Sequence, residues 1–281
     1  MTSTCDLPSS AAAPAGAETP QTLFLAERLE EAEQAARWAV VARLDQHAGH
    51  YCFRYTRGVE KLEGFTPLAE FPDVEVAACS RELFPLFRNR LLNRRRKEYT
   101  RALAWSGFSV DDPPDDLQLL AITEGRRVTD QLELFAPPQP VRGESVFRSR
   151  FFVHGVRHLD DSVREQLLRL SPGTPAKLRR EDENPADSHA VAVDTVLPDC
   201  DEPTPIGYVP RYLAREVRRG WEQPGLADPQ LRVVQVNPDA PQQQRVLAEL
   251  TYALPTGEQP FASDRFQGRV RLPDPIDETA A

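Results

Sequence analysis

The sequence has no long apolar run. Nowhere in its 281 residues do apolar side chains approach the roughly 20 consecutive positions that a membrane-spanning helix needs. The first twenty residues carry acids and prolines, where a signal peptide would carry a basic start and an apolar stretch. Both absences argue against a membrane or secreted protein, and we predict a soluble, cytoplasmic one.

Closely spaced cysteines are also missing. Cys5, Cys52, Cys79 and Cys200 lie too far apart for the CxxC or CxxxxC pairs that bind zinc. The spacing indicates neither a zinc site nor a disulfide framework, and a reducing compartment keeps isolated thiols free. We therefore predict that the cysteines are reduced.

The standard catalytic signatures are absent. The sequence contains no GxxxxGK(S/T) phosphate loop, no GxGxxG after a strand, no HExxH and no GxSxG. His154 and His158 are four residues apart, which would suit a metal only on a helix, whereas their segment is typical of a strand leading into a turn. We predict no enzyme activity, no cofactor and no bound metal.

Lysine is scarce and the net charge is negative. The chain has three lysines, so arginine supplies nearly all positive charge, as the coding bias of a GC-rich bacterial genome would also produce. A net charge of −9 argues against a protein that coats DNA by bulk electrostatics, because such binding grows with the number of phosphates neutralised. Any contact with nucleic acid must be local.

One segment has the opposite charge. From Arg88 to Arg101 there are seven basic residues and a single acid. The centre of this run is a candidate for a secondary nucleic-acid patch and comprises Arg94, Arg95, Arg96 and Lys97. The simpler interpretation, which we favour, is a solvated helix face.

The first half predicts an α+β module over residues 21–136, preceded by a disordered tail at 1–20. Apolar positions after residue 22 are near helical spacing, so a helix is possible from about Ala26. The β-branched stretch 38–44 then predicts a strand in a hairpin with 51–55.

The end of the first half has clear boundary signals. The acids before Leu117 are placed to cap a helix that ends near Gly125, and a short strand is predicted at 132–135. The prolines that follow indicate a linker, which we place at 137–145.

The second half predicts a β-rich domain over residues 146–255, followed by a mostly irregular tail at 256–281. Five or six short strands with two helices are typical of a small β-barrel. The overall fold class is therefore α+β, with an N-terminal α+β module and a C-terminal barrel flanked by two helices.

Two segments of this domain carry the most information. They are Leu178-Arg-Arg-Glu-Asp-Glu-Asn-Pro-Ala-Asp-Ser-His-Ala-Val-Ala-Val193 and Ile206-Gly-Tyr-Val-Pro-Arg-Tyr-Leu-Ala214. Their acidic loop with an Asn-Pro-x-Asp core, followed by a strand and then Gly-aromatic before a helix, resembles the signature of the HIRAN domain. Phe152-Val-His-Gly-Val-Arg-His158 resembles the opening strand and turn of that family.

The resemblance implies a domain that binds the 3′ end of single-stranded DNA. Asp187 matches the family's aspartate that accepts a hydrogen bond from the terminal 3′-hydroxyl, and Asn184 lies in the same loop. Arg157 and His158 match the pair that supports phosphate and base.

Tyr208 and Arg211 match positions near the terminal phosphates. The sequence differs from the family pattern at the position just before the aspartate, where the family often has a stacking tyrosine and this chain has Ala186. Affinity should therefore be lower, or the ligand different. A purely structural role is also open, since Asn184-Pro185 favours a turn and Asp187 can cap its own loop.

The first half also resembles a known module. Tyr51-Cys-Phe-Arg-Tyr55 and Leu83-Phe-Pro-Leu-Phe-Arg-Asn-Arg-Leu-Leu92 are similar to the N-terminal subdomain of HipA-type kinases. The kinase body is missing, so the resemblance implies interaction or scaffolding.

We therefore predict a nucleic-acid binder acting in DNA repair, DNA processing or genome defence, with a helicase or nuclease as a possible partner. A first alternative is a non-catalytic regulatory protein, in a toxin–antitoxin or defence context, whose barrel binds protein. A minor alternative is a metal-dependent hydrolase acting on nucleic acid with Asp187, His189 and His158.

Overall fold

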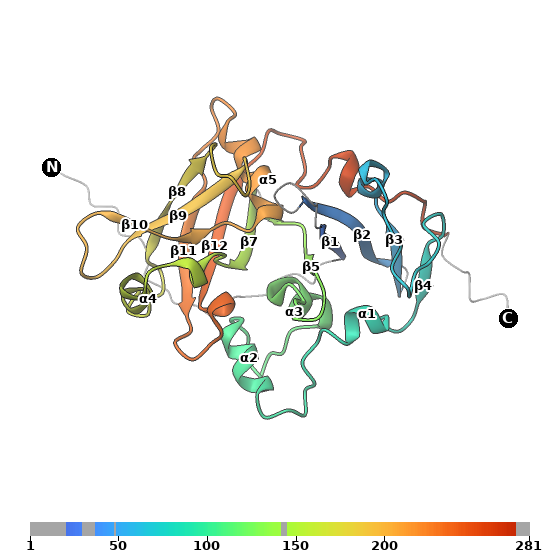
Figure 1. Cartoon of the computed structure of the whole chain (residues 1–281), viewed down its shortest axis with the longest axis horizontal. Coiled ribbons are helices and arrows are strands. Elements are labelled where there is room, and N and C mark those ends of the chain that lie inside the picture. The colour runs from blue at the N-terminus through green and yellow to red at the C-terminus, as the bar shows by residue number, and fades with distance from the viewer. Residues whose placement is uncertain (1–20, 30–36, 48, 142–144, 274–281) are drawn as a thin grey trace.

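The computed structural model describes residues 21–29, 37–47, 49–141 and 145–273. These residues form two antiparallel sheets side by side, with short helices below and between them (Figure 1). The described part of the chain contains no helix that is both long and apolar enough to traverse a bilayer.

The first sheet has five strands in the order β4-β3-β2-β1-β5. Their bounds are β1 Thr22–Leu29, β2 Arg37–His47, β3 His50–Tyr55, β4 Ala78–Ser80 and β5 Leu132–Phe135. The antiparallel pairing of β2 with β3 confirms the predicted hairpin, and β5 confirms the strand expected at 132–135.

The helix expected from about Ala26 is wrong, because this segment continues as β1. Leu23 and Leu25 pack into one hydrophobic cluster, whereas Phe24 and Ala26 pack into another. A strand that is buried on both faces has apolar residues at successive positions instead of alternating ones. The expected helix would also have covered residues 30–36, which lie outside the described residues.

The prediction of reduced cysteines is also wrong for one pair. Cys52 on β3 and Cys79 on β4 are direct register partners and form a disulfide. They are 27 residues apart, so their proximity depends on strand pairing and not on local spacing. Cys200 has a free thiol, and Cys5 lies outside the described residues.

Short helices connect the strands of the first half. They are η1 Arg57–Lys61, α1 Pro85–Arg88, α2 Tyr99–Trp105 and α3 Asp116–Thr123. Asp115 caps α3 by accepting a hydrogen bond from the Gln118 N–H, while the Gln118 side chain accepts one from the Asp115 N–H, which confirms the predicted helix start. The chain leaves α3 through Glu124, whose φ of 57° is left-handed.

The second sheet has seven strands in the order β10-β9-β8-β11-β12-β7-β6. Their bounds are β6 Gln139–Pro140, β7 Val146–Phe152, β8 Pro175–Glu181, β9 Ala190–Val196, β10 Pro203–Tyr208, β11 Gln230–Val236 and β12 Val246–Ala253. The expected linker thus contributes β6, which pairs with β7.

The barrel that the sequence predicted is not closed among the described residues. The outer neighbour of β7 is β6, which pairs with it at Phe147 and Arg148, and β10 lies at the opposite edge of the sheet. The two regions meet instead at one isolated bridge, in which His154 and Tyr208 exchange backbone hydrogen bonds of 3.0 and 2.9 Å. The sheet is therefore curled and pinned at a single point.

Two α-helices accompany this sheet, α4 Asp161–Leu167 and α5 Arg211–Trp221, together with the short turn η2 Val156–His158. One face of α5 is fully buried, and its exposed face carries arginines. This helix places its N-terminal side chains beside the loop between β8 and β9.

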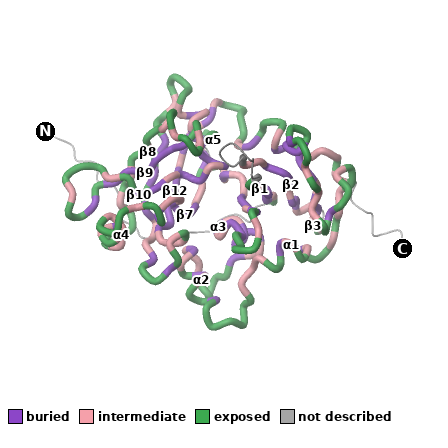
Figure 2. Tube along the Cα trace, viewed as in Figure 1, coloured by how far each residue is buried: buried purple, intermediate pink, exposed green. Residues whose placement is uncertain are grey.

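One hydrophobic core joins the two halves. Phe135 of the first half stacks on Tyr212 of α5 with ring centroids 4.2 Å apart, and Phe24 contacts Phe261 and Phe266 of the C-terminal segment. Figure 2 shows buried chain running from one sheet to the other. The C-terminal segment is therefore packed against the first half, where Gly268 bridges Thr56 and the Val270 carbonyl accepts a hydrogen bond from Arg54.

Candidate nucleic-acid interface

The loop between β8 and β9 is organised by Asn184. Its side-chain oxygen accepts hydrogen bonds from the backbone N–H groups of Ala186 and Asp187, at 3.0 and 3.2 Å. Its amide donates to Glu181 at 2.8 Å. Asn is favoured here because its short side chain replaces backbone partners in a tight turn. The turn presents Asp187 at a fixed position.

Tyr208 joins the same network from β10. Its hydroxyl donates to Glu181 at 3.1 Å, on the carboxylate oxygen that also accepts from Asn184. The hydrogen bond from Asn184 is the main reason why the pKa of Glu181 is lowered, and burial followed by the nearby Glu181 charge raises the pKa of Tyr208. Tyr208 is therefore a neutral donor at physiological pH.

Asp187 faces the first turn of α5. One carboxylate oxygen accepts the His189 N–H at 2.9 Å, and the other lies 3.3 Å from the Arg211 guanidinium. Arg211 also donates to the Ala186 carbonyl. The structure thus brings together Asn184, Asp187, Tyr208 and Arg211, four of the six predicted positions.

The other two predicted positions, Arg157 and His158, form a separate pair on η2. Arg157 donates to the His158 ring at 3.0 Å, and both side chains are exposed. The turn reaches the site through Gly155, where a Cβ atom would lie 3.1 Å from the Tyr208 ring. Within the described ranges, no hydrogen bond or ion pair joins Arg157 or His158 to the Asp187 loop.

A cavity of about 270 Å³ opens beside Asp187. Its lining consists of Trp38, Ala186, Asp187, Ser188, His189, Arg211, Arg215 and Arg265. We call this the end pocket. It combines the β8–β9 loop and α5 with a residue of the first sheet and one of the C-terminal segment.

Sequence reasoning did not identify Trp38, Arg215 or Arg265 as residues of the end pocket. Arg215 follows Arg211 by one helical turn, a spacing that would have placed both on one face of α5. Trp38 and Arg265 had no such signal, because they belong to segments distant in sequence from the Asp187 loop.

The end pocket is locally basic in an acidic protein. It contains three guanidinium groups and one carboxylate. Arg211 pairs with Asp187, whereas the described residues offer neither Arg215 nor Arg265 a carboxylate within ion-pair distance. Arg265 lies over the Phe266 ring and its buried Nε has no hydrogen-bond partner. Burial, and next the charge of Arg215, lower the pKa of Arg265. Such a pair of cations favours an anion between them.

The basic run of the first half lies elsewhere. Arg94, Arg95, Arg96 and Lys97 are exposed in the turn between α1 and α2, and Arg94 pairs with Asp116 at 3.0 Å. Figure 1 places α1 and α2 on the opposite side of the molecule from α5. The secondary patch is therefore separate from the end pocket. The prediction that the run forms one solvated helix face is also wrong, because these four residues lie in a turn.

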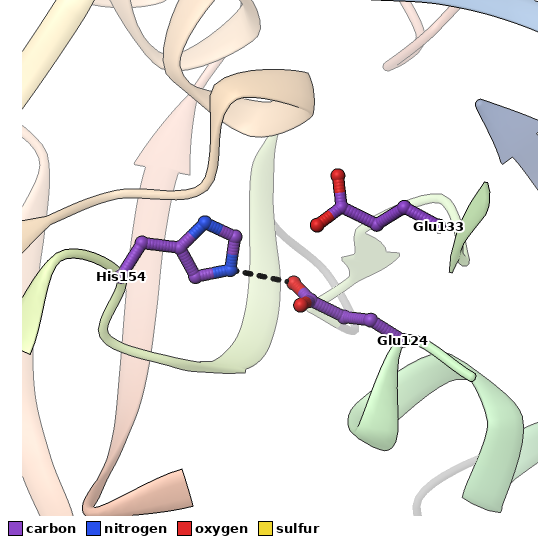
Figure 3. Close-up of side chains that lie close together, drawn as sticks. All are labelled: Glu124, Glu133 and His154. Atoms are coloured by element: carbon purple, nitrogen blue, oxygen red, sulfur yellow. Dashed lines mark hydrogen bonds and ion pairs between the residues drawn. The ribbon is translucent and has the colours of Figure 1, made fainter. Parts of the chain in front are cut away.

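A second cluster lies where the halves meet. Glu124, Glu133 and His154 have ligand atoms within 4.8 Å of one another, which could suit a metal ion (Figure 3). Arg126 however pairs with both carboxylates, at 2.7 Å from its Nε to Glu124. Tyr212 donates to Glu124 at 3.1 Å. The guanidinium supplies the positive charge, so the cluster acts as an ion network between the two halves.

Comparison with known proteins supports the assignment of the second half. The HIRAN domain family model matches residues 146–251, and HIRAN domains are in general nucleic-acid-binding modules. A crystal structure of a protein from Lactobacillus plantarum is 23% identical, over 37% of this chain and 91% of that one, with a TM-score of 0.26. No curated protein matches the chain. The resemblance of residues 21–136 to the HipA subdomain stays a prediction.

Proposed function

We propose that this protein binds the 3′ end of single-stranded DNA at the end pocket and does not itself catalyse a reaction. The observation that carries the proposal is the position of Asp187, a carboxylate held by its own loop beside Arg211, where the region that matches the HIRAN family model borders a basic cavity. A helicase or nuclease would be a suitable partner for such a binder.

The chemistry of the carboxylate supports recognition of a terminus. An ionised carboxylate only accepts hydrogen bonds, so Asp187 suits a free 3′-hydroxyl, which an internal nucleotide lacks. A 3′-phosphate would place negative charge against Asp187 and should be rejected. Arg211 beside it can pair with the preceding phosphate. Neither partner reads a base edge, so we expect little sequence preference.

The test is binding of labelled single-stranded oligonucleotides that differ only at the 3′ end. We expect a 3′-hydroxyl strand to bind at least tenfold more tightly than a 3′-phosphate strand or a circular strand, since a hydrogen bond to a charged group contributes about 1.5–3 kcal/mol. Equal binding of all three strands would reject end recognition. No binding of any strand would favour the protein-binding alternative.

Asp187→Asn makes the test specific to this residue. The amide removes the charge that repels a 3′-phosphate, so the preference for the 3′-hydroxyl should fall several-fold. The matched control is Glu183→Gln, which removes an exposed carboxylate from the same loop and should leave the preference unchanged. A preference that both variants keep would contradict the role of Asp187.

A further inference from the structure

We propose that the first sheet and the C-terminal segment take part directly in binding, with Trp38 stacking on the terminal base and Arg215 and Arg265 holding a backbone phosphate. This inference rests on the proposed function and extends the site beyond the HIRAN domain, which ends at residue 251. All three residues line the end pocket together with Asp187.

Trp38 is held rigidly in place. It lies on β2, and its indole N–H donates to Glu133 at 2.9 Å. Its ring is 5.7 Å from that of Phe135 and 6.3 Å from that of Tyr212, nearly parallel to the latter. An indole fixed in this way loses little conformational freedom when a base stacks on it. Stacking of a base on an aromatic ring contributes about 1–3 kcal/mol and tolerates any base.

The only ring that the loop itself offers to the pocket is the imidazole of His189, which is smaller than an indole. Ala186 is exposed and lines the same cavity, so its small side chain leaves space beside Asp187. Among the lining residues that the structure describes, Trp38 has the largest aromatic ring. We infer that this chain obtains its base platform from the neighbouring sheet.

The two arginines suit one phosphate. Arg215 is exposed and Arg265 half-buried, and the charge of each opposes that of the other. A phosphate between them would relieve this repulsion. Arg211 is paired with Asp187, whereas the described residues place no carboxylate within ion-pair distance of Arg215 or Arg265, so these two are further cations for the ligand beside Arg211.

The size of the pocket limits the ligand. A volume of 270 Å³ is near the lower end of small-molecule sites, which span about 300–1,000 Å³. One nucleotide end fits this space better than several nucleotides of an uninterrupted strand. The rest of a strand would leave across the surface.

Fluorescence provides a direct test of the position of Trp38. The chain has three tryptophans, and Trp105 and Trp221 lie outside the end pocket. In a double variant with Trp105→Phe and Trp221→Phe, Trp38 is the sole tryptophan. We expect a 3′-hydroxyl oligonucleotide to quench its emission, with a midpoint equal to the dissociation constant. Binding without any change in emission would overturn the stacking.

Substitutions test the energetic role. Trp38→Ala should weaken binding about tenfold or more, and Trp38→Phe should recover much of the loss because a ring remains. Arg215→Gln and Arg265→Gln should each weaken binding. Because both arginines contact the same phosphate, the two substitutions together should lower the slope of log affinity against log salt concentration by about one. A change in salt slope would not follow from misfolding alone, and melting curves verify that each variant is folded.

The outcomes separate this inference from the proposed function. If the wild-type protein prefers the 3′-hydroxyl strand while Trp38→Ala and Arg265→Gln bind as it does, the inference is wrong and the function stands. If the wild-type protein binds no strand, both fail. If the arginine variants lose affinity with an unchanged salt slope, the phosphate contact is refuted.

Discussion

Removing the charge of Glu124 tests the contact between the two halves of the chain. Its side chain is 6% exposed, at the end of α3. One oxygen lies 2.8 Å from the His154 ring nitrogen and 3.1 Å from the Tyr212 hydroxyl, both in the second half. The other lies 2.7 Å from the Nε of Arg126. One carboxylate thus connects α3, the end of β7 and α5.

Two variants separate charge from contact. Glu124→Gln keeps one acceptor oxygen but turns an N–H donor toward Arg126, and we expect a loss of about 2 kcal/mol. Glu124→Ala leaves Tyr212 and His154 without their acceptor, for which we expect about 3 kcal/mol, at the low end of the roughly 3–5 kcal/mol for a broken buried pair. The low end applies because Arg126 is 43% exposed and remains solvated.

The measurement is urea unfolding at neutral pH, with thermal melting beside it. A loss of 3 kcal/mol corresponds to a melting temperature lower by roughly 6–12 °C in a domain of 150–250 residues. Glu63→Gln is the control, since this carboxylate is exposed and remote from the network. We expect the control to change stability by less than about 0.5 kcal/mol.

The pH dependence follows from the pKa of Glu124. Burial by itself would raise this pKa, but the charges of His154 and Arg126 and the hydrogen bond from Tyr212 outweigh it and hold the pKa below the ordinary value. A lowered folded pKa means that the stabilisation is complete above the unfolded pKa and is lost as the pH falls through the folded one.

The stability difference between the wild-type protein and Glu124→Gln should therefore be constant near neutral pH. It should shrink once the pH falls below the ordinary glutamate pKa of 4.5. A glutamine variant as stable as the wild-type protein at neutral pH would refute the network. A difference that stays constant far below this pKa would refute the assigned pKa direction.

Three further outcomes are expected. Reducing the Cys52–Cys79 disulfide should cost about 3.5 kcal/mol by the chain-entropy relation for a separation of 27 residues, and alkylation of both thiols without reductant would contradict the bond. Gly207→Ala places a Cβ atom 2.3 Å from a backbone oxygen at the bridge, so it should destabilise by at least 2 kcal/mol in urea, well beyond Gly173→Ala, which has a positive φ but open space. Arg90→Ala should lower the free energy of unfolding by about 3 kcal/mol, because its 2% exposed side chain is salt-bridged. The folded variant should bind oligonucleotides as tightly as the wild-type protein, and weaker binding would indicate that the basic run contacts nucleic acid.

The basic run shows how charge alone misleads. Arg90 belongs to it but is buried and bonded to Asp130 at 2.7 Å and to the Gly125 carbonyl at 2.8 Å. Arg94 pairs with Asp116. Two arginines of the run are thus paired with acids from distant segments, which sequence spacing cannot reveal.

What the sequence determined by itself was local. The Asn184 turn, the Asp115 cap and the β2–β3 hairpin depend on neighbours a few residues apart, so side-chain chemistry and short spacing predicted them. The HIRAN signature likewise lies in one loop, one strand and one helix start, and it located Asp187 and Arg211 in the same site.

Only the tertiary structure decided the long-range features. Burial of both faces of β1, the Cys52–Cys79 bond and the single bridge that pins the curled sheet depend on which surfaces pack together. The same packing brings Trp38 and Arg265 to the end pocket from segments that lie far from Asp187 along the chain. Contacts of this kind leave no periodic pattern in the sequence, because they are stabilised by apolar surface that is buried only when the two halves pack together.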